Sequence, residues 1–377
     1  MQVTEFIREI KRLGIAMITG IPDSALKPFC DYINAAGGTE FCHYVPANEG
    51  AAVGIAIGSY LATGNPVCVY AQNSGLGNMV NPITSLANGA VYGIPMLLVI
   101  GWRGEPGTKD EPQHKFMGHI TEELLAALEI EHAVLGRELS EDAIADAFGR
   151  AAGALQKSRQ FPFVIKRDFF ESGQKNIYKN KYSMVREDAI CQIVSSIGAE
   201  DVIVSTTGKI SREVYEQSER INGQHGQDFL TVGGMGYASM IAFGIAKERP
   251  NKRVYCLDGD GAALMHMGSL AFLGKEQPEN LVHICLNNEA HESVGGMPTG
   301  CVGLEYAKVA EACGYSVIYV VDNLTELSRV IDEIKRERRL AFLEVRVSMD
   351  SRADLGRPQE SALENRTHFM EYHGRDR

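Results

Sequence analysis

The chain has 377 residues, of which 45% are hydrophobic and 23% are charged, and its formal net charge is -11. This balance is typical of a folded globular protein, and the length is sufficient for two domains. The excess of acidic side chains argues against nucleic acid as the main partner, because phosphate backbones are bound by clustered Lys and Arg. No apolar run reaches membrane-spanning length; the nearest, 91–102, contains Gly93 and Pro95.

Charged side chains interrupt the N-terminus, so we expect no signal peptide there; they are Glu5, Arg8, Glu9, Lys11 and Arg12. Eight cysteines are scattered along the chain without a Cys-x-x-Cys pair, and most lie in apolar, strand-like stretches. We predict that they are reduced core residues of a cytoplasmic protein, and not zinc ligands or disulfides.

Helix-like and strand-like segments alternate along both halves of the chain. In the first half the predicted strands are 16–19, 67–70, 97–100 and 163–166, and the predicted helices are 27–36, 49–61 and 121–128. In the second half the strands are 202–205, 254–257, 281–286, 317–321 and 342–347, and the helices are 187–197, 238–247 and 326–336. Apolar strands between helices predict parallel sheets covered on both faces, so the expected fold class is α/β with two doubly wound sheets.

A polar stretch rich in Lys and Asn separates the two halves at 173–183. We therefore expect an N-terminal domain at 1–170, a linker at 171–185 and a C-terminal domain with a tail at 186–377. No third domain is expected between them.

The motif Gly259-Asp260-Gly261 is followed, after 25 residues (262–286), by Asn287-Asn288. Each motif comes directly after a predicted strand, and the segment between them is helix-like, with Leu264, Met267, Leu270 and Ala271 on one face. A parallel β-α-β unit brings the carboxyl ends of its strands to the same sheet edge, so Asp260 and Asn288 are expected to meet there. Carboxylate and amide oxygens are ligands that Mg²⁺ prefers, so the two motifs together predict a magnesium site. Either motif alone would indicate only an ordinary turn.

This layout resembles the motif of thiamine diphosphate-dependent enzymes. The resemblance implies a pyrimidine-binding N-terminal domain and a diphosphate-binding C-terminal domain. It implies that Mg²⁺ is held by Asp260, Asn288 and the carbonyl of Ala290. It also implies diphosphate contacts from the residues around the first motif, which are Gly259, Asp260, Gly261 and Ala262.

Glu49 lies among small residues at the start of a predicted helix. A glutamate at this position is often only a favourable charge for the helix dipole. The resemblance implies a second role, because thiamine enzymes use a glutamate that bonds N1′ of the aminopyrimidine. In that family this glutamate and the metal motif face each other across a subunit interface, which implies a homodimer or a higher homo-oligomer with active sites between chains.

Three further loops resemble cofactor contacts of the family. Gly233 and Met235 match the loop beneath the bent cofactor, although a plain glycine-rich turn is the alternative. Contacts to the diphosphate are expected from Thr207, Gly208 and Lys209. A contact beside the pyrimidine is expected from Asn73, in the glycine-rich run 73–78, which resembles a loop of the family. None of the glycine-rich loops completes Gly-x-Gly-x-x-Gly, which argues against a nicotinamide or flavin dehydrogenase.

Four stretches resemble the phosphonopyruvate decarboxylases, a compact thiamine-dependent subgroup; they are 20–24, 101–107 with 110–114, 292–299 and 352–358. The resemblance implies decarboxylation of an anionic 2-keto acid to an aldehyde and CO₂. Sulfopyruvate decarboxylases are similar but are usually built from two separate subunits, so we rank them second, together with carboligation. A cofactor-binding subunit without catalysis is the alternative from a different class.

A substrate phosphonate needs cationic or N–H partners. The candidates are Arg103, Lys109, His114, Lys115, Arg352 and Arg357, each of which is equally compatible with an ordinary surface charge. His114 is the preferred residue for proton handling, since a neutral imidazole near pH 7 both donates and accepts. Asp23 and Ser24 follow the first strand and are expected to line the substrate pocket.

Overall fold

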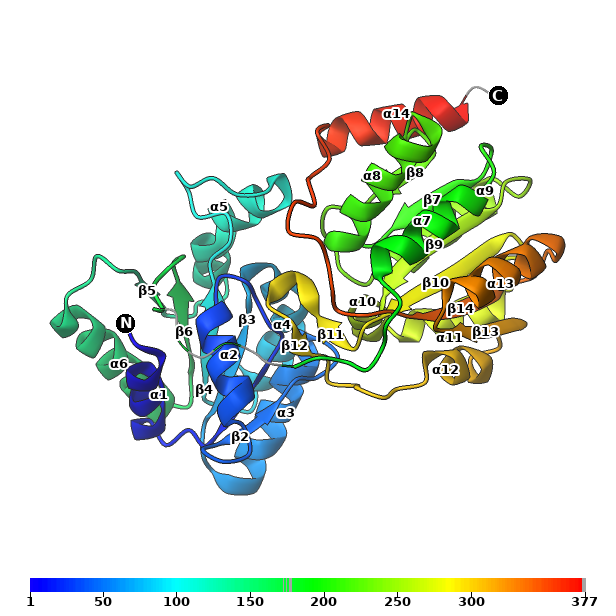
Figure 1. Cartoon of the computed structure of the whole chain (residues 1–377). Helices are drawn as coiled ribbons and strands as arrows, with labels where there is room; N and C mark the ends of the chain where they lie inside the picture. Colours follow the sequence, from blue (N-terminus) through cyan, green and yellow to red (C-terminus); the bar gives the residue numbers. More distant parts are fainter. Residues whose placement is uncertain (172, 174, 176–177, 375–377) are drawn as a thin grey trace. The chain divides into compact units, whose positions relative to one another are not determined.

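The computed structural model describes residues 1–171, 173, 175 and 178–374. It contains two compact units: unit 1 comprises Met1–Tyr178 and His291–Gly300, and unit 2 comprises Lys179–Ala290 and Cys301–Arg377. Each unit is built on a six-stranded parallel sheet with helices (Figure 1), so the predicted α/β fold class is confirmed. The domain bounds stay a prediction, and four positions of the expected linker, 172, 174, 176 and 177, lie outside the described residues.

The sheet of unit 1 has the strand order β2-β1-β3-β4-β6-β5. Its strands are β1 (Met17–Gly20), β2 (Cys42–Tyr44), β3 (Val67–Gln72), β4 (Met96–Gly101), β5 (Ala133–Leu135) and β6 (Gln160–Ile165). The helices are α1 (Val3–Arg12), α2 (Lys27–Ala36), α3 (Glu49–Thr63), η1 (Asn73–Gly75), α4 (Leu76–Pro82), η2 (Ile83–Ala87), α5 (Pro112–Ala127) and α6 (Glu141–Gln156).

Two apolar cores cover the two faces of this sheet. Along β3, Cys68 and Tyr70 belong to one core, whereas Val67, Val69 and Ala71 belong to the other. Successive side chains of a strand point to opposite faces, so a strand buried on both sides must be apolar throughout. This is why the strands of unit 1 appear in the sequence as continuous apolar runs.

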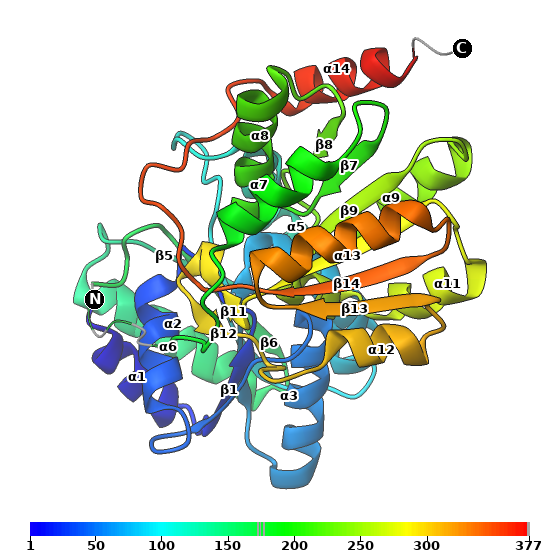
Figure 2. The ribbon, with the colours of Figure 1, turned by 45° about the vertical axis from the view of Figure 1, so that its right-hand side comes forward.

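The sheet of unit 2 has the order β13-β14-β10-β9-β7-β8. Its strands are β7 (Val202–Ser205), β8 (Asp228–Leu230), β9 (Val254–Gly259), β10 (Leu281–Asn287), β13 (Val317–Val321) and β14 (Ala341–Arg346). The helices are α7 (Arg186–Ser196), α8 (Lys209–Asn222), α9 (Ala238–Glu248), α10 (Asp260–Met265), α11 (Gly268–Glu276), α12 (Tyr306–Ala312), α13 (Leu324–Arg336) and α14 (Ala362–Gly374). Figure 2 shows α13 and α12 on either side of β13 and β14.

The strands of the two sheets are arranged in the same order. In each unit the first strand lies between the second and the third, and the last strand in sequence lies inside the one before it. The halves therefore share a topology, although the sequence shows no obvious repeat. The direction of winding reverses beside the first strand of each sheet, at β1 and β3 in unit 1 and at β7 and β9 in unit 2, and ligands bind at such switch points in open α/β sheets.

A segment late in the chain, His291–Gly300, belongs to unit 1. It includes η3 (Glu292–Val294) and β12 (Met297–Pro298), the partner of β11 (Ala290–His291). Met297 is buried in the same core as Tyr70. The backbone of Gly300 lies so close to Val45 that a Cβ atom there would stand 1.7 Å from the Val45 carbonyl oxygen.

Two local expectations from the sequence are wrong in detail. The glycine-rich run 73–78 is the start of a helical segment, η1 followed by α4, and not a loop. The helix expected after Asp260 is broken into α10 and α11, because His266 adopts φ -129° and ends the first of them. The strands β2, β5 and β8 have only three residues each, too few to give a clear periodic pattern.

All eight cysteines are free, but the expectation that they lie in the core is correct for only four of them. Cys42 is exposed, and Cys191, Cys301 and Cys313 are partly exposed. Within the part of the chain that the structure describes, no helix combines the length and the apolar character that a membrane span requires.

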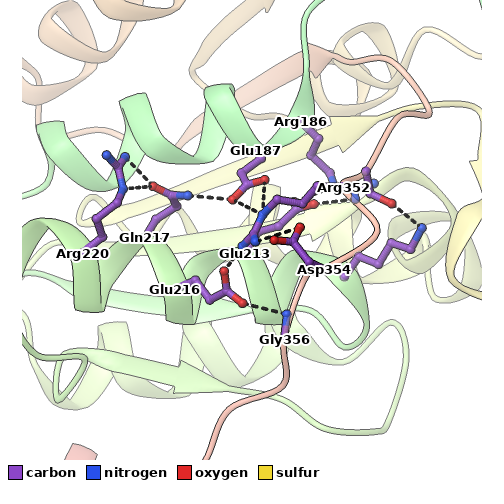
Figure 3. Close-up of polar contacts among 11 residues, drawn as sticks. Arg186, Glu187, Glu213, Glu216, Gln217, Arg220, Arg352, Asp354 and Gly356 are labelled. Carbon is purple, nitrogen blue, oxygen red and sulfur yellow. Dashed lines mark hydrogen bonds and ion pairs between the residues drawn. The ribbon is translucent and has the colours of Figure 1, made fainter.

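A buried ion pair joins α7 to α8. The Arg186 guanidinium donates to both carboxylate oxygens of Glu213, at 2.8 and 2.7 Å, and the two side chains are 4% and 1% exposed. Figure 3 shows this pair beside a chain of polar contacts that runs from Arg220 through Gln217 to Glu187. A buried ion pair matters for stability mainly because loss of one partner would leave the other charge buried without a counterion.

We predict that Glu213→Gln lowers the unfolding free energy of unit 2 by about 3–5 kcal/mol, because Arg186 would keep a buried charge without its counterion. Urea unfolding of the purified protein measures the change. Glu9→Gln is the control, since its pair with Arg12 is exposed and should cost less than about 1 kcal/mol. Equal losses in the two variants would contradict the argument from burial.

Candidate cofactor and active site

Four segments gather at the carboxyl edge of the sheet in unit 2. They follow the adjacent parallel strands β10, β9, β7 and β8, and they begin at Asn288, Asp260, Thr206 and Thr231; the segment at Asp260 is the start of α10 and the others are loops. In the register of β9 and β10, Gly259 is paired with Leu286, so the two motifs of the sequence leave the sheet side by side. The structure thus brings the four segments with predicted metal and cofactor contacts to one edge.

Asp260 is the buried acid of this edge. It is the first residue of α10 and is 3% exposed, and burial raises the pKa of its carboxyl to about 7, although backbone N–H groups at Gly261 and Asn288 act in the opposite direction. Among the described residues, no hydrogen-bond partner reaches Oδ2. A buried carboxylate oxygen that lacks a partner is costly, and a divalent cation is the kind of ligand that would stabilise it.

Asn288 and Ala290 form a tight turn beside Asp260. The amide oxygen of Asn288 accepts a hydrogen bond from the Ala290 N–H at 3.1 Å, and the Asn180 side chain donates to the Asn288 carbonyl at 2.8 Å. Between them, Glu289 adopts a left-handed backbone with φ 57°. Such a conformation costs roughly 1–3 kcal/mol for a residue other than glycine, and it is found most often at functional sites.

The other two loops supply polar groups and glycines. Lys209 begins α8 and donates from Nζ to the Ser351 hydroxyl at 2.6 Å, while the Thr207 hydroxyl donates to the Val232 carbonyl at 2.9 Å. Gly208 has φ 97°, a conformation that other residues rarely adopt. In the loop after β8, Gly233 and Met235 are half-buried.

In unit 1, Glu49 is 6% exposed at the start of α3. Its Oε2 accepts a hydrogen bond from the Asn78 side chain at 2.7 Å. A Cβ atom on Gly75 would lie 2.6 Å from Oε1, so only glycine leaves room for the carboxyl at this point. Asn78 and Gly75 are functional candidates that the sequence did not single out, and the signal that could have found them is the polar, glycine-rich start of the segment after β3.

Asp23 and Ser24 lie at the carboxyl end of β1, next to Arg103 after β4. The Arg103 guanidinium donates to the Ser24 hydroxyl at 2.7 Å and holds Asp110 by two bonds, at 2.8 and 2.5 Å. Asp23 is fully buried, and burial raises the pKa of its carboxyl to about 6, although Arg103 opposes this. Its Oδ1 has no hydrogen-bond partner among the described residues.

Other predicted residues are engaged within their own unit. The Asn73 amide is fully buried and donates to the Arg103 carbonyl and to the Thr121 hydroxyl, so it braces the ends of β3 and β4 against α5. His114 is half-buried in α5, where burial, together with Arg103, lowers the pKa of its imidazole. The ring is therefore neutral near pH 7, as expected for proton handling.

The cations proposed for a phosphonate differ in their surroundings. Arg352 pairs with Glu187 and Glu216 in unit 2, and Lys109 and Lys115 are exposed in unit 1. Of the six candidates, Arg103 has the strongest structural support, because it donates to Ser24 and lies close enough to Asp23 to affect the pKa of that carboxyl.

Two family models match the chain. Residues 2–128 match the model described as "Thiamine pyrophosphate enzyme, N-terminal TPP binding domain", and residues 206–345 match "Thiamine pyrophosphate enzyme, C-terminal TPP binding domain". A phosphonopyruvate decarboxylase from Streptomyces hygroscopicus is 32% identical, covering 99% of this chain and 94% of the relative. One from Streptomyces viridochromogenes is 32% identical over 98% and 94%.

This chain belongs to the thiamine diphosphate-dependent decarboxylases. The family assigned from the motifs is thereby confirmed, as are thiamine diphosphate as the cofactor and decarboxylation of a keto acid as the reaction. A sulfopyruvate decarboxylase from Methanosarcina acetivorans is 28% identical over 90% of this chain and 89% of its own length. Since that relative matches along almost its full length as one chain, a single-chain architecture does not separate the two substrate classes in this decarboxylase family.

Asp23 gives a prediction about pH and stability. A carboxyl with a raised pKa in the folded state holds its proton after the unfolded chain has lost it, so stability falls as pH rises from about 4 to about 6 and stays lower above that. The shift from 3.8 to about 6 corresponds to about 3 kcal/mol. The stability of Asp23→Asn relative to the wild type should therefore increase by about 2–3 kcal/mol from pH 4 to pH 8.

Urea unfolding of both proteins at the two pH values measures this difference. The comparison cancels the other titrating groups, which the two proteins share. A stability difference that is the same at pH 4 and pH 8 would show that Asp23 titrates normally.

Proposed function

We propose that this decarboxylase converts 3-phosphonopyruvate to phosphonoacetaldehyde and CO₂, with Mg²⁺ and thiamine diphosphate, as a step of phosphonate metabolism. The observation that carries the proposal is the pair of phosphonopyruvate decarboxylases that match at 32% identity along almost the whole chain. The sulfopyruvate decarboxylase matches at 28% over a shorter part. Sulfopyruvate is therefore the second candidate substrate.

In the proposed cofactor site, Asp260, Asn288 and the Ala290 carbonyl hold Mg²⁺, and the buried Oδ2 of Asp260 is the atom most in need of a cation. Thr207 and Lys209 bind the diphosphate from the loop after β7, while Gly208 allows its backbone to turn there. Gly233, Met235, Gly259, Gly261 and Ala262 complete the proposed contacts. When bound, thiamine diphosphate supplies the carbanion that adds to the keto carbon and takes up the electrons as CO₂ leaves.

Glu49 is the proposed activating acid. Asn78 fixes one oxygen of the carboxyl and Gly75 leaves space at the other, so the side chain is held ready to share a proton with a ring nitrogen. Asn73 then acts indirectly, by holding the end of β3 where the segment that carries Gly75 and Asn78 begins.

At the substrate end, Arg103 and Ser24 are the proposed anion-binding pair. Asp110 orients the guanidinium with two hydrogen bonds, which leaves its Nη1 side directed at Ser24. Asp23 and the neutral His114 are the proposed groups for proton handling, because the pKa of Asp23 is about 6 and that of His114 lies below its usual value.

A homo-oligomer, at least a dimer, is part of this proposal. The support in unit 1 is the outer face of α3, where Leu61 is 70% exposed and where a Cβ atom on Gly54 or Gly58 would meet nothing within 4 Å. Small residues allow another helix to approach closely, and a monomer gains nothing by exposing such an apolar face. Active sites between chains would place Glu49 of one subunit opposite Asp260 of another.

The substrate assignment is tested by offering phosphonopyruvate, sulfopyruvate and pyruvate to the purified protein with thiamine diphosphate and Mg²⁺. Aldehyde release is followed with a coupled dehydrogenase. We expect kcat/KM for phosphonopyruvate to exceed that for pyruvate by at least about 100-fold, since an unpaired anion-binding site rejects an uncharged group. A preference for sulfopyruvate would contradict the proposed substrate. The absence of aldehyde with all three keto acids would favour carboligation or a non-catalytic subunit.

The role of Glu49 is tested by Glu49→Gln. We expect kcat to fall by about 10²–10⁴-fold, because an amide does not exchange the proton, while the Kd for Mg²⁺ and thiamine diphosphate changes little. Fluorescence titration measures that Kd, and Glu9→Gln is the control for a glutamate of the same unit outside the site. Activity near that of the wild type would remove Glu49 from the mechanism.

A further inference from the structure

The C-terminal segment of unit 2 carries a cluster of histidine and glutamate side chains outside the cofactor site. Among the described residues, two groups of His, Cys, Asp and Glu are close enough to hold a metal ion: His225, Glu360 and His368 form one, and Cys256, Asp258 and His283 form the other. The second group lies in the dry core beneath the sheet edge, where His283 already contacts Asp258 and Tyr315. The first group lies near the surface, where an ion can enter.

Three separate segments build this first group, which we call the tail cluster. His225 lies in the turn between α8 and β8, Glu360 lies just before α14, and His368 lies on α14. Figure 1 shows α14 beside α8 and β8 at the end of unit 2. Asn365, also on α14, docks this helix on β8 by donating to the Asp228 carbonyl at 3.0 Å and accepting from the Leu230 N–H at 3.1 Å.

Glu360 stands at the centre of the tail cluster. Its two carboxylate oxygens lie 2.7 Å from Nε2 of His225 and 2.8 Å from Nδ1 of His368. One ligand atom from each of the three side chains lies within 4.8 Å of the others. Two ligands of a tetrahedral zinc ion are separated by about 3.3 Å at ordinary bond lengths, so side-chain rotations alone would bring the three atoms around one ion.

The orientation of His225 is that of a metal ligand. Its Nδ1 contacts the Glu219 carboxylate at the end of α8, which leaves Nε2 directed at Glu360. A histidine that binds a metal through one nitrogen commonly donates the other N–H to a carboxylate, which fixes the ring and its tautomer. The Tyr215 ring also packs edge-on against the imidazole, with centroids 4.8 Å apart.

Two facing atoms of the tail cluster are buried without a hydrogen bond. The Glu360 side chain is only 9% exposed, and neither its Oε1 nor the Nε2 of His225 has a hydrogen-bond partner among the described residues, despite their close approach. When Nδ1 of a neutral His225 donates to Glu219, Nε2 faces the Glu360 carboxylate as a second acceptor, so the two atoms need a proton or a cation between them. A cation placed between them and His368 would satisfy both.

We propose that the tail cluster is a transition-metal site, with Zn²⁺ bound by His225, Glu360 and His368 and with Glu219 as the outer partner of His225. Two imidazoles and one carboxylate suit Zn²⁺ and its neighbours, whereas Mg²⁺ prefers an all-oxygen shell such as that around Asp260. Water completes the coordination, because the three protein ligands leave a fourth position open. The site is structural, and it does not depend on the proposed substrate.

Such an ion would fasten the C-terminal segment at a second point. The first point is visible in Figure 3, where Arg352 pairs with Glu187 and Glu216, and the Gly356 N–H donates to Glu216 at 2.7 Å. Ser351, at the start of the same segment, accepts the hydrogen bond from Lys209. The tail cluster would thus fix the end of the C-terminal segment, and the start of the same segment contacts a predicted diphosphate residue.

The test uses the full-length, tag-free holoenzyme, stripped with EDTA and reloaded with Mg²⁺ and thiamine diphosphate. Titration with ZnCl₂ should show one equivalent bound with a Kd tighter than about 10 µM. His368→Gln removes an exposed ligand without disturbing the core, and it should abolish this binding. Glu219→Gln removes only the outer partner and should raise Kd by about 10- to 100-fold.

His132→Gln is the matched control, since His132 also lies beside a glutamate, Glu122, at 3.4 Å but belongs to no candidate metal group among the described residues. It should leave the Kd for zinc unchanged. Co²⁺ provides a second measurement, because a four-coordinate site gives visible absorption that should be lost in His368→Gln. The proposal is overturned if zinc binds no tighter than this limit, or if His368→Gln binds it as the wild type does; the cluster would then be an ion-pair network only.

Discussion

Parallel pairing of β9 with β10 on one side and β7 on the other is the constraint on which the cofactor site depends. It fixes the ends of three strands at one edge, so that Asp260, Asn288 and Lys209 reach the same region although up to 79 residues separate them. The pairing itself is stabilised by a sheet that is apolar on both faces. A shift of one residue in β10 would turn its side chains to the opposite face and move Asn288 away from Asp260.

Several features of the site destabilise the fold, and interactions elsewhere in the molecule must offset them. Asp23 and Asp260 are buried acids with raised pKa values, and each has a carboxylate oxygen without a partner. Glu289 adopts a strained backbone between two predicted metal ligands. These features destabilise the fold by amounts comparable to its net stability, so they are maintained by the surrounding apolar cores and by buried pairs such as Arg186 and Glu213.

Within unit 2, the C-terminal segment contacts both the helices that stabilise it and a loop of the predicted cofactor site. It is fastened to α7 and α8 through Arg352 and Gly356, and α14 covers the edge of β8 through Asn365. An edge strand covered in this way is protected from pairing with other chains. The same segment contacts Lys209 through Ser351, so the covering of the sheet edge and the arrangement of the predicted diphosphate loop are physically connected.

The sequence by itself determined the α/β class and the longer strands, because apolar runs are local properties of the chain. The cofactor and the reaction followed from the resemblance of its motifs to those of thiamine diphosphate-dependent enzymes. It also placed Asp260, Asn288 and Glu49 at element boundaries that the structure bears out. Only the tertiary structure decided which side chains meet: that Asn78 and Gly75 surround Glu49, that Asp110 orients Arg103, and that His225, Glu360 and His368 converge. These contacts depend on strand order and helix packing, which bring together residues whose separation along the chain carries no periodic signal.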